Sequence, residues 1–380
     1  MKELELYLHI PFCIRKCLYC DFLSFPASGK VRGEYLEALK QELILMSEET
    51  GEYTVSSVFF GGGTPSLLTG DQMKALMDTI RRGYRLAEDA EITMECNPGT
   101  ATADHLKAYR ESGVNRLSIG LQSAQDPELR ALGRIHTWGD FQRTFRDAGL
   151  AGFENINVDL MSALPGQSPD SYRDTLKKVL ALGPELKHIS AYSLILEEGT
   201  PFWDLAKQGK LDLPDEEKDR ELYELTGKVL GEAGFSRYEI SNYARPGYEC
   251  RHNLGYWIRR EYLGFGLGAA SLFRGERFSN TESLEEYLRK PGLRAGEPEG
   301  ISPEEAGSEL VILGLRLIRG VSFWEFRTLT GRELTDVYGE AIRKHENEGL
   351  LVRIPEEGDI RLALTEKGLD LANYVMADFV

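Results

Sequence analysis

An alternation of short apolar segments with longer amphipathic ones, from the N-terminus to about residue 195, restricts the fold more than any other feature. Strand-like and helix-like segments in this order predict βαβ units around a parallel sheet. The expected strands are Leu4–Ile10, Val58–Gly61, Glu91–Cys96, Arg116–Gly120, Asn155–Met161 and His188–Leu194. The expected helices are Val31–Ser47, Asp71–Tyr84, Ala103–Ser112, Asp140–Ala148 and Ser168–Ala181. Periodicity alone leaves open a doubly wound sheet or an incomplete barrel.

The chain changes character after this region. A helix over Asp215–Ala233 and a strand over Phe235–Tyr243 are expected next, and residues 244–300 look irregular. Ser302-Pro303 is a good helix start, because serine caps a helix and proline suits its first turn. Two more helices, a hairpin and a final helix then resemble a winged helix. We therefore expect three regions: residues 1–245, a connecting region over 246–300, and a small α+β domain over 301–380.

Charge argues against nucleic acid as a partner. The formal net charge is −16, and residues 301–380 carry 9 Lys and Arg against 15 Asp and Glu. A winged helix that binds DNA normally presents a basic face. No apolar run reaches the roughly 18–20 residues that span a bilayer. Met1–Glu5 does not resemble a signal peptide. We therefore expect a cytoplasmic protein without a transmembrane segment.

Three of the five cysteines fall within eight residues, directly after the first expected strand. Cys13, Cys17 and Cys20 have the spacing C-x3-C-x2-C. Clustered thiolates favour an iron–sulfur cluster or zinc. A cubane cluster normally takes four cysteines. Either Cys96 or Cys250 completes the set, or one iron takes a ligand from outside the protein. Zinc sites of the closed structural type usually pair a C-x2-C with a second such pair, and this chain has none.

Polar residues and glycines recur where the later strands end. They are Gly61-Gly62-Gly63-Thr64-Pro65, Glu95, Gln122, Asp159, Tyr192 and Ser193, with Arg134 beyond the fourth strand. Ligands of α/β folds bind at the carboxyl ends of strands, so we expect these residues to line one site. The cysteine spacing and this set resemble the radical S-adenosylmethionine superfamily. That resemblance implies a 4Fe–4S cluster whose fourth iron binds S-adenosylmethionine.

Within that superfamily, the segments resemble the oxygen-independent coproporphyrinogen III oxidase family from Tyr7-Leu8-His9-Ile10-Pro11-Phe12-Cys13 onwards, over roughly residues 4–290. This resemblance implies a partial parallel (β/α)6 barrel. It also implies S-adenosylmethionine contacts from Tyr7, Gly62, Gly63, Thr64, Glu95, Gln122, Arg134 and Asp159. Two features depart from the oxidases. Phe22 stands where they have a further cysteine, and few residues precede Cys13. In both features the chain resembles the heme chaperone subfamily, HemW.

A second motif is His252-Asn253-Leu254-Gly255-Tyr256-Trp257. It resembles the H-N-x-x-Y-W motif of the heme chaperone subfamily, which is associated with heme. Imidazole is a common ligand of heme iron, and aromatic side chains suit the walls of a heme site. The resemblance thus implies that His252, Tyr256 and Trp257 bind heme, with His252 on the iron. From the residues alone, a turn with a histidine and two core aromatics is the simpler interpretation.

Two functions follow from these resemblances. The first is a heme chaperone that hands heme to acceptor proteins, such as cytochromes of a respiratory chain, and that keeps a cluster reduced by an electron donor. The second is a radical enzyme that acts on a porphyrinogen. The cofactors implied are a 4Fe–4S cluster, S-adenosylmethionine and heme. The sequence leaves open whether the chain is an enzyme, since it retains the radical site and departs from the oxidases.

Overall fold

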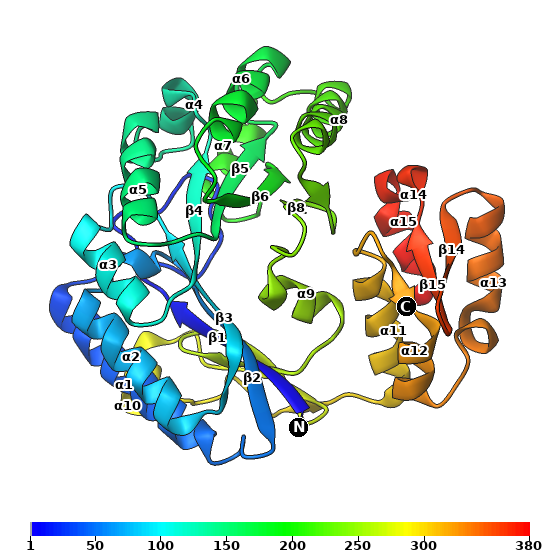
Figure 1. The fold of residues 1–380 in the computed structure, drawn as a ribbon, viewed down its shortest axis with the longest axis horizontal. Coiled ribbons are helices and arrows are strands. Elements are labelled where there is room, and N and C mark those ends of the chain that lie inside the picture. Colours follow the sequence, from blue (N-terminus) through cyan, green and yellow to red (C-terminus); the bar gives the residue numbers. More distant parts are fainter. Residues whose placement is uncertain (1) are drawn as a thin grey trace.

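A computed structural model describes residues 2–380 and contains two cores, a large α/β domain and a small C-terminal domain (Figure 1). Six parallel strands pair in chain order in the large sheet. They are β1 (Lys2–Ile10), β2 (Tyr53–Gly62), β3 (Leu86–Cys96), β4 (Arg116–Gln122), β5 (Ile156–Ser162) and β6 (Leu186–Ser193). The expected α/β fold with a mostly parallel sheet is therefore confirmed.

Helices follow the strands and cover the outer face of the sheet (Figure 1). They are α1 (Gly29–Ser47), α2 (Gly70–Gly83), α3 (Ala103–Glu111), α4 (Asp126–Ala131), α5 (Trp138–Leu150), α6 (Pro169–Leu180), α7 (Pro201–Lys207) and α8 (Glu216–Glu232), with a single 3₁₀ turn, η1 (Pro65–Leu67). Thr69 and Thr137 begin α2 and α5 with capping boxes, in which side chain and backbone satisfy each other's free groups. The residues at these positions therefore favour the start of a helix.

The two faces of the sheet differ in polarity. In β1, Leu4, Leu6 and Leu8 are fully buried in the main core, while Glu5 and Tyr7 point to the opposite, inner face. Strand register carries this alternation across the sheet, because Glu5 pairs with Ser57 and Tyr7 with Phe59. The inner face consequently collects ionisable and polar side chains, namely Glu5, Glu91, Glu95, Arg116, Ser118, Asn157, Asp159 and His188. This polar interior is where a site can form.

The expectation that residues 244–300 are irregular is wrong. This stretch contains α9 (Arg251–Trp257), β9 (Tyr262–Phe265), β10 (Ala270–Phe273), β11 (Glu276–Ser279), α10 (Leu284–Arg289) and β12 (Glu299–Gly300). Strand β9 pairs in parallel with β1, and β10 to β12 extend the same sheet with antiparallel pairing. The boundary at residue 245 thus cuts through one continuous sheet. Strands of two to four residues are too short to show periodicity.

The single strand expected over Phe235–Tyr243 is also wrong. Two short strands, β7 (Ser236–Arg237) and β8 (Asn242–Ala244), pair with each other, and β8 lies antiparallel to β6. This antiparallel pair ends the run of parallel strands on the β6 side. The sheet therefore has antiparallel strands at both ends, and its parallel part consists of β9 together with β1 to β6.

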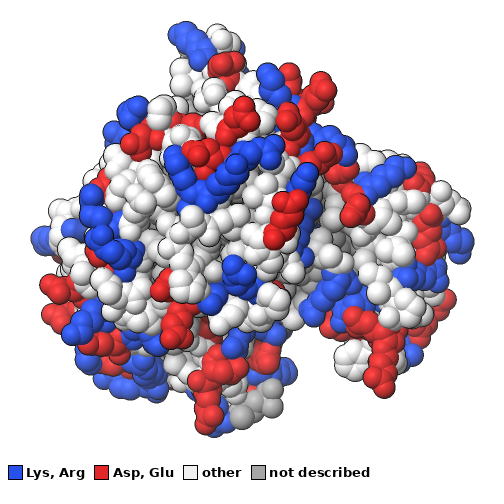
Figure 2. Space-filling model, turned by 45° about the horizontal axis from the view of Figure 1, so that its top comes forward, with Lys and Arg blue, Asp and Glu red and all other residues white. Residues whose placement is uncertain are grey.

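The C-terminal domain has helices around a three-stranded antiparallel sheet with its own core. Its elements are α11 (Pro303–Gly314), β13 (Val321–Ser322), α12 (Phe323–Thr330), α13 (Leu334–Asn347), β14 (Leu351–Glu356), β15 (Asp359–Leu364), α14 (Glu366–Asp370), α15 (Ala372–Met376) and the 3₁₀ turn η2 (Ala377–Phe379). Acidic and basic side chains are interspersed over the visible face of both domains (Figure 2). No helix among residues 2–380 combines the length and apolarity needed to cross a membrane.

The C-terminal domain contacts the large domain beside α9. Glu309 in α11 pairs with Arg259 at 2.7 Å and with Arg277 at 2.9 Å. The Arg316 guanidinium lies 5.4 Å from the ring centre of Trp257, the last residue of α9. The small domain is therefore docked on the segment that carries the histidine motif.

Candidate cluster and cofactor site

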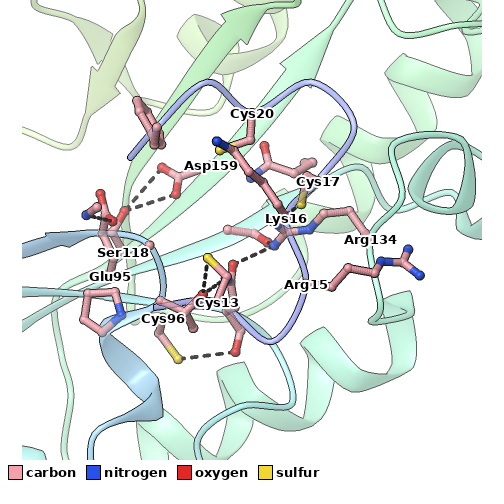
Figure 3. A pocket seen from close by; sticks show the side chains of 18 of the residues that line it. Cys13, Arg15, Lys16, Cys17, Cys20, Glu95, Cys96, Ser118, Arg134 and Asp159 are labelled. Atoms are coloured by element: carbon pink, nitrogen blue, oxygen red, sulfur yellow. Dashed lines mark hydrogen bonds between the residues drawn. The ribbon is translucent and has the colours of Figure 1, made fainter. Parts of the chain in front are cut away.

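The three clustered cysteines lie on the loop after β1, partly exposed and with free thiols. They line a cavity of about 140 Å³ at the carboxyl ends of the parallel strands (Figure 3). Of the eight residues expected to contact S-adenosylmethionine, seven line the same cavity, namely Gly62, Gly63, Thr64, Glu95, Gln122, Arg134 and Asp159. The eighth, Tyr7, is not among the residues that line the cavity. It lies on the inner face of β1, where its hydroxyl shares a hydrogen bond with His9 Nδ1 at 3.0 Å.

The donor set suits a cluster better than a single metal ion. Within residues 2–380, no three His, Cys, Asp or Glu side chains converge on one ion. A cubane takes one cysteine per iron, so its cysteines need not meet at one point. Cys96 also lines the cavity, but its side chain is buried and its thiol is directed to the carbonyl oxygen of Asn97, 3.8 Å away. Three thiols therefore fit a cluster with one iron left for another ligand.

Cys250 lies away from the cluster loop. It is fully buried, and its thiol donates to Glu91 Oε1 over 3.4 Å. Burial strongly raises the pKa of this thiol, and Cys250 is not among the residues that line the cavity with the cluster loop. Cys250 is therefore not placed to supply a fourth ligand in this structure.

Two partly buried carboxylates, those of Glu95 and Asp159, face the cysteine loop across the cavity. Glu95 accepts a hydrogen bond from the Gly62 amide at 3.1 Å, and Asp159 accepts from Asn157 Nδ2 at 2.6 Å. Asp159 also accepts from the Ser118 hydroxyl (Figure 3). Burial raises the pKa of Glu95 to about 8, and the nearby Asp159 adds to the effect. A cation bound nearby would lower the pKa of both carboxyl groups and so favour their charged form. The cavity therefore suits a ligand that carries positive charge opposite the cluster.

Gly62 and Gly63, at the end of β2, allow the backbone to pass close to neighbouring residues. Gly62 has φ +104°, and a Cβ there would lie 2.4 Å from the imidazole of His9. A Cβ on Gly63 would lie 2.7 Å from the carbonyl oxygen of Ile10. Only glycine fits such close approach and such a backbone. The backbone of β2 is thereby brought against the start of the cysteine loop.

Asn97 is a site residue that sequence reasoning missed. Its amide nitrogen donates to Thr64 Oγ1 at 2.8 Å, and its oxygen accepts from Arg134 Nη2 at 2.7 Å. Thr64 in turn donates to Cys13 Sγ at 3.4 Å, and Arg134 Nη1 to Cys17 Sγ at 3.5 Å. The available signal was its place two residues after Glu95, at the end of a strand.

The histidine motif lies inside the large domain, on α9 (Figure 1). Its His252 side chain is 2% exposed. Nδ1 shares a hydrogen bond with Ser57 Oγ at 2.8 Å, and Nε2 with the Tyr256 hydroxyl at 3.2 Å. Burial lowers the pKa of His252 to about 3. In this conformation both ring nitrogens are hydrogen-bonded, so neither is free to bind heme iron.

Aromatic rings fill the space between α9 and the cluster cavity. The ring centres of Phe59 and His252 are 5.0 Å apart, and those of Tyr7 and Phe59 are 6.3 Å apart, both nearly parallel. Glu91 fixes the start of α9, since it accepts from the backbone amides of Arg251 at 3.2 Å and His252 at 3.3 Å. The motif therefore closes the inner face of the sheet beneath the cavity.

Glu5, beneath the motif, makes stability depend on pH. It is fully buried, and burial raises its pKa to about 8 despite Arg260 at 3.1 Å. The unfolded carboxyl titrates near 4.5, so this raised pKa gives stability that is complete below that value and is lost as pH rises through about 8. We expect Glu5→Gln to remove up to about 1.4 kcal/mol per pH unit of this slope in denaturant titrations. An equal slope in wild type and Glu5→Gln would contradict the assignment.

Comparison with known proteins agrees with this geometry. Residues 7–179 match the radical SAM superfamily, and residues 301–371 match the HemN C-terminal domain. The solved coproporphyrinogen III oxidase HemN from Escherichia coli, described as a radical SAM enzyme, has TM-score 0.84 and 25% identity, and covers 100% of this chain and 90% of its own. The fold and the cysteine loop thus define a protein of the radical SAM class.

Curated relatives narrow the class. Heme chaperone HemW of Bacillus subtilis is 37% identical over 378 residues, which cover 98% of each chain. Heme chaperone HemW of Escherichia coli is 42% identical over 270 residues, 71% of this chain and 70% of its own. The chain belongs to the HemW family of heme chaperones.

Proposed function

We propose that this protein binds heme and hands it to acceptor proteins, such as cytochromes of a respiratory chain, and that it carries a 4Fe–4S cluster with S-adenosylmethionine on the open iron. The observation that supports a chaperone most directly is the filled interior. Tyr7, Phe59 and His252 occupy the inner face beneath the cluster cavity, where a substrate next to the cofactor would need room. Membership of the HemW family points the same way.

Cys13, Cys17 and Cys20 would hold the cluster. When bound, the cluster supplies one-electron chemistry to the sulfonium of S-adenosylmethionine. Glu95 and Asp159 would orient the positively charged cofactor, because both are carboxylates that line the cavity. The Gly62–Gly63 backbone would approach its methionine part, and Gln122 and Arg134 would close the remaining side. A cytochrome and an electron donor are proposed partners of this assembly.

Heme at the H-N-x-x-Y-W motif would require α9 to leave its place. His252 would have to exchange its hydrogen bonds to Ser57 and Tyr256 for iron. Tyr256 and Trp257 are partly buried beside it and would supply apolar walls. Because α11 of the C-terminal domain contacts α9, movement of that domain is the simplest route to an open motif.

The alternative is a radical enzyme acting on a porphyrinogen, and the 25%-identical oxidase of the same fold favours it. Phe22 opposes it, since the oxidases that this chain resembles have a cysteine there. Phe22 is 61% exposed at the rim of the cavity and replaces a thiol with an apolar ring. Anaerobic reconstitution followed by heme titration separates the two. Stoichiometric heme uptake and release to an apo-cytochrome, without turnover of coproporphyrinogen III, is expected; turnover would overturn the chaperone proposal.

For the heme site, we expect His252→Ala to weaken heme binding at least tenfold and to change the Soret spectrum, because an iron ligand is removed. Equilibrium heme titration of the folded variant measures this. His188→Ala is a matched control, since His188 is also buried on the inner face and bonded at both nitrogens, to Asn157 and Tyr238. An unchanged affinity and spectrum in His252→Ala would exclude His252 as a heme ligand.

A further inference from the structure

A single chain of hydrogen bonds connects two of the three clustered cysteines. It runs from Cys13 Sγ to the Thr64 hydroxyl at 3.4 Å, on to the amide nitrogen of Asn97 at 2.8 Å, and from the amide oxygen of Asn97 to Arg134 at 2.7 Å. Arg134 then reaches Cys17 Sγ at 3.5 Å. Four separate segments of the chain contribute these residues: the loop after β1, the end of β2, the end of β3 and the loop after α4.

The direction of each hydrogen bond follows from chemistry. Arg134 has donors alone, so Asn97 must turn its oxygen to Arg134 and its NH₂ to Thr64. The Thr64 hydroxyl oxygen accepts this hydrogen bond from Asn97, and the Thr64 hydroxyl proton is donated to Cys13. Asn97 thus contacts both residues that donate to cysteine sulfur, Thr64 and Arg134, and holds each of them in the orientation in which it donates.

The network is also held rigidly. Thr64 is 3% exposed, and Arg134 Nη2 has a second acceptor in the Gly120 carbonyl at 2.6 Å. Ser66 Oγ accepts from the Asn97 backbone amide at 3.1 Å. Hydrogen bonds in such partly buried networks are stronger than in water and reinforce one another. The donors therefore stay on the sulfurs.

We infer that Thr64 and Arg134, positioned by Asn97, donate hydrogen bonds to the sulfurs of Cys13 and Cys17 and thereby raise the reduction potential of the cluster. This inference rests on the proposed cluster site. Reduction adds one electron to the cluster and makes its sulfur ligands more negative. A donor to sulfur stabilises the reduced state more than the oxidised state, and hydrogen bonds to sulfur are one of the levers that set cluster potentials. Asn97 is a positioning residue, since it reaches the sulfurs only through its two neighbours.

The test is the midpoint potential of the anaerobically reconstituted full-length protein without S-adenosylmethionine. Dithionite is the reductant in a mediated titration, followed by the electron paramagnetic resonance signal of the reduced cluster. Thr64→Val keeps the shape of the side chain and removes the hydroxyl. We expect it to lower the reduced-to-oxidised ratio at a fixed potential about tenfold, which is about 59 mV for a one-electron couple. Thr64→Ser keeps the hydroxyl and should stay within threefold of wild type.

Asn97→Leu should shift the ratio at least as far as Thr64→Val, because it releases both donors. Iron and sulfide content distinguishes this role from a purely structural one. A structural role reduces the loaded fraction and leaves the potential of that fraction unchanged. Full loading of Thr64→Val and Asn97→Leu with an unshifted potential would overturn the inference. Failure of the wild-type protein to take up a cluster would instead overturn the proposed cofactor site, and the inference with it.

Discussion

Cys17→Ala is expected to take up less than one iron per chain after anaerobic reconstitution, against about four for the wild-type protein. Cys17 is one of three thiols on the loop after β1, and the remaining two leave two irons of a cubane without protein ligands. The Arg134 guanidinium 3.5 Å from Cys17 would also lose its sulfur acceptor. Iron and sulfide analysis, with the visible absorbance of the cluster, measures the loss. Binding of S-adenosylmethionine should disappear with it, because the open iron is gone.

Two other cysteines provide matched controls. Cys250→Ala removes a fully buried thiol next to Glu91, and Cys96→Ala removes the thiol that shares the cavity with the cluster loop. Both variants should keep about four irons. If Cys96→Ala also loses the cluster, Cys96 is a fourth ligand, and the open-iron site is wrong. If Cys17→Ala retains four irons, the whole assignment of the loop fails.

The six central strands could be predicted because each is long enough to show its pattern. Leu4, Leu6 and Leu8 alternate with Glu5 and Tyr7, and the same two-residue period recurs up to β6. The strands over 262–300 could not, since each has four residues or fewer and gains its stability from pairing with β1 or with its neighbour. Pairing between residues more than 250 positions apart leaves no local trace in the sequence.

Some residues of the candidate site could likewise be predicted from the sequence, and others could not. Glu95, Asp159 and the glycines at 62 and 63 were accessible to reasoning from strand ends, because parallel strands bring their carboxyl ends to one edge. Asn97 was missed because its importance lies in its partners, Thr64 and Arg134, which are far from it in sequence. The burial of His252 was equally hidden, since the residues that enclose it come from β1 and β2.

The position of α9 links the two motifs of the chain. Its first turn is held by Glu91 from β3 and by Ser57 from β2, and its end contacts the C-terminal domain. A change that displaces α9 therefore acts on the proposed heme motif and on the rings of Tyr7 and Phe59 that pack against it. Gly255, in the middle of the helix, lies directly against the side chain of Glu5 in β1.

Gly255→Ala is expected to destabilise the protein by about 3 kcal/mol, because overpacking a rigid core costs one to three kcal/mol or more. A Cβ on Gly255 would lie 2.0 Å from the Glu5 carboxylate, which is fully buried and held by Arg260. Neither side can give way without breaking a buried contact. Urea unfolding monitored by circular dichroism measures the change. Gly231→Ala in α8 is the control: nothing lies within 4 Å of its Cβ, so it should gain about 0.5–1 kcal/mol.

The cause can be isolated with a double variant. Glu5→Ala removes the group that the new methyl would meet, so adding Gly255→Ala to Glu5→Ala should cost at least 1 kcal/mol less than in the wild type, a coupling typical of residues in contact. Additive effects would show that α9 is displaced for another reason. On the proposed heme site, Gly255→Ala should also take up heme faster than the wild-type protein, because a helix pushed off β1 exposes His252. Stopped-flow heme binding with an unchanged rate, in a variant that is destabilised as expected, would mean that heme reaches this protein without the motif opening.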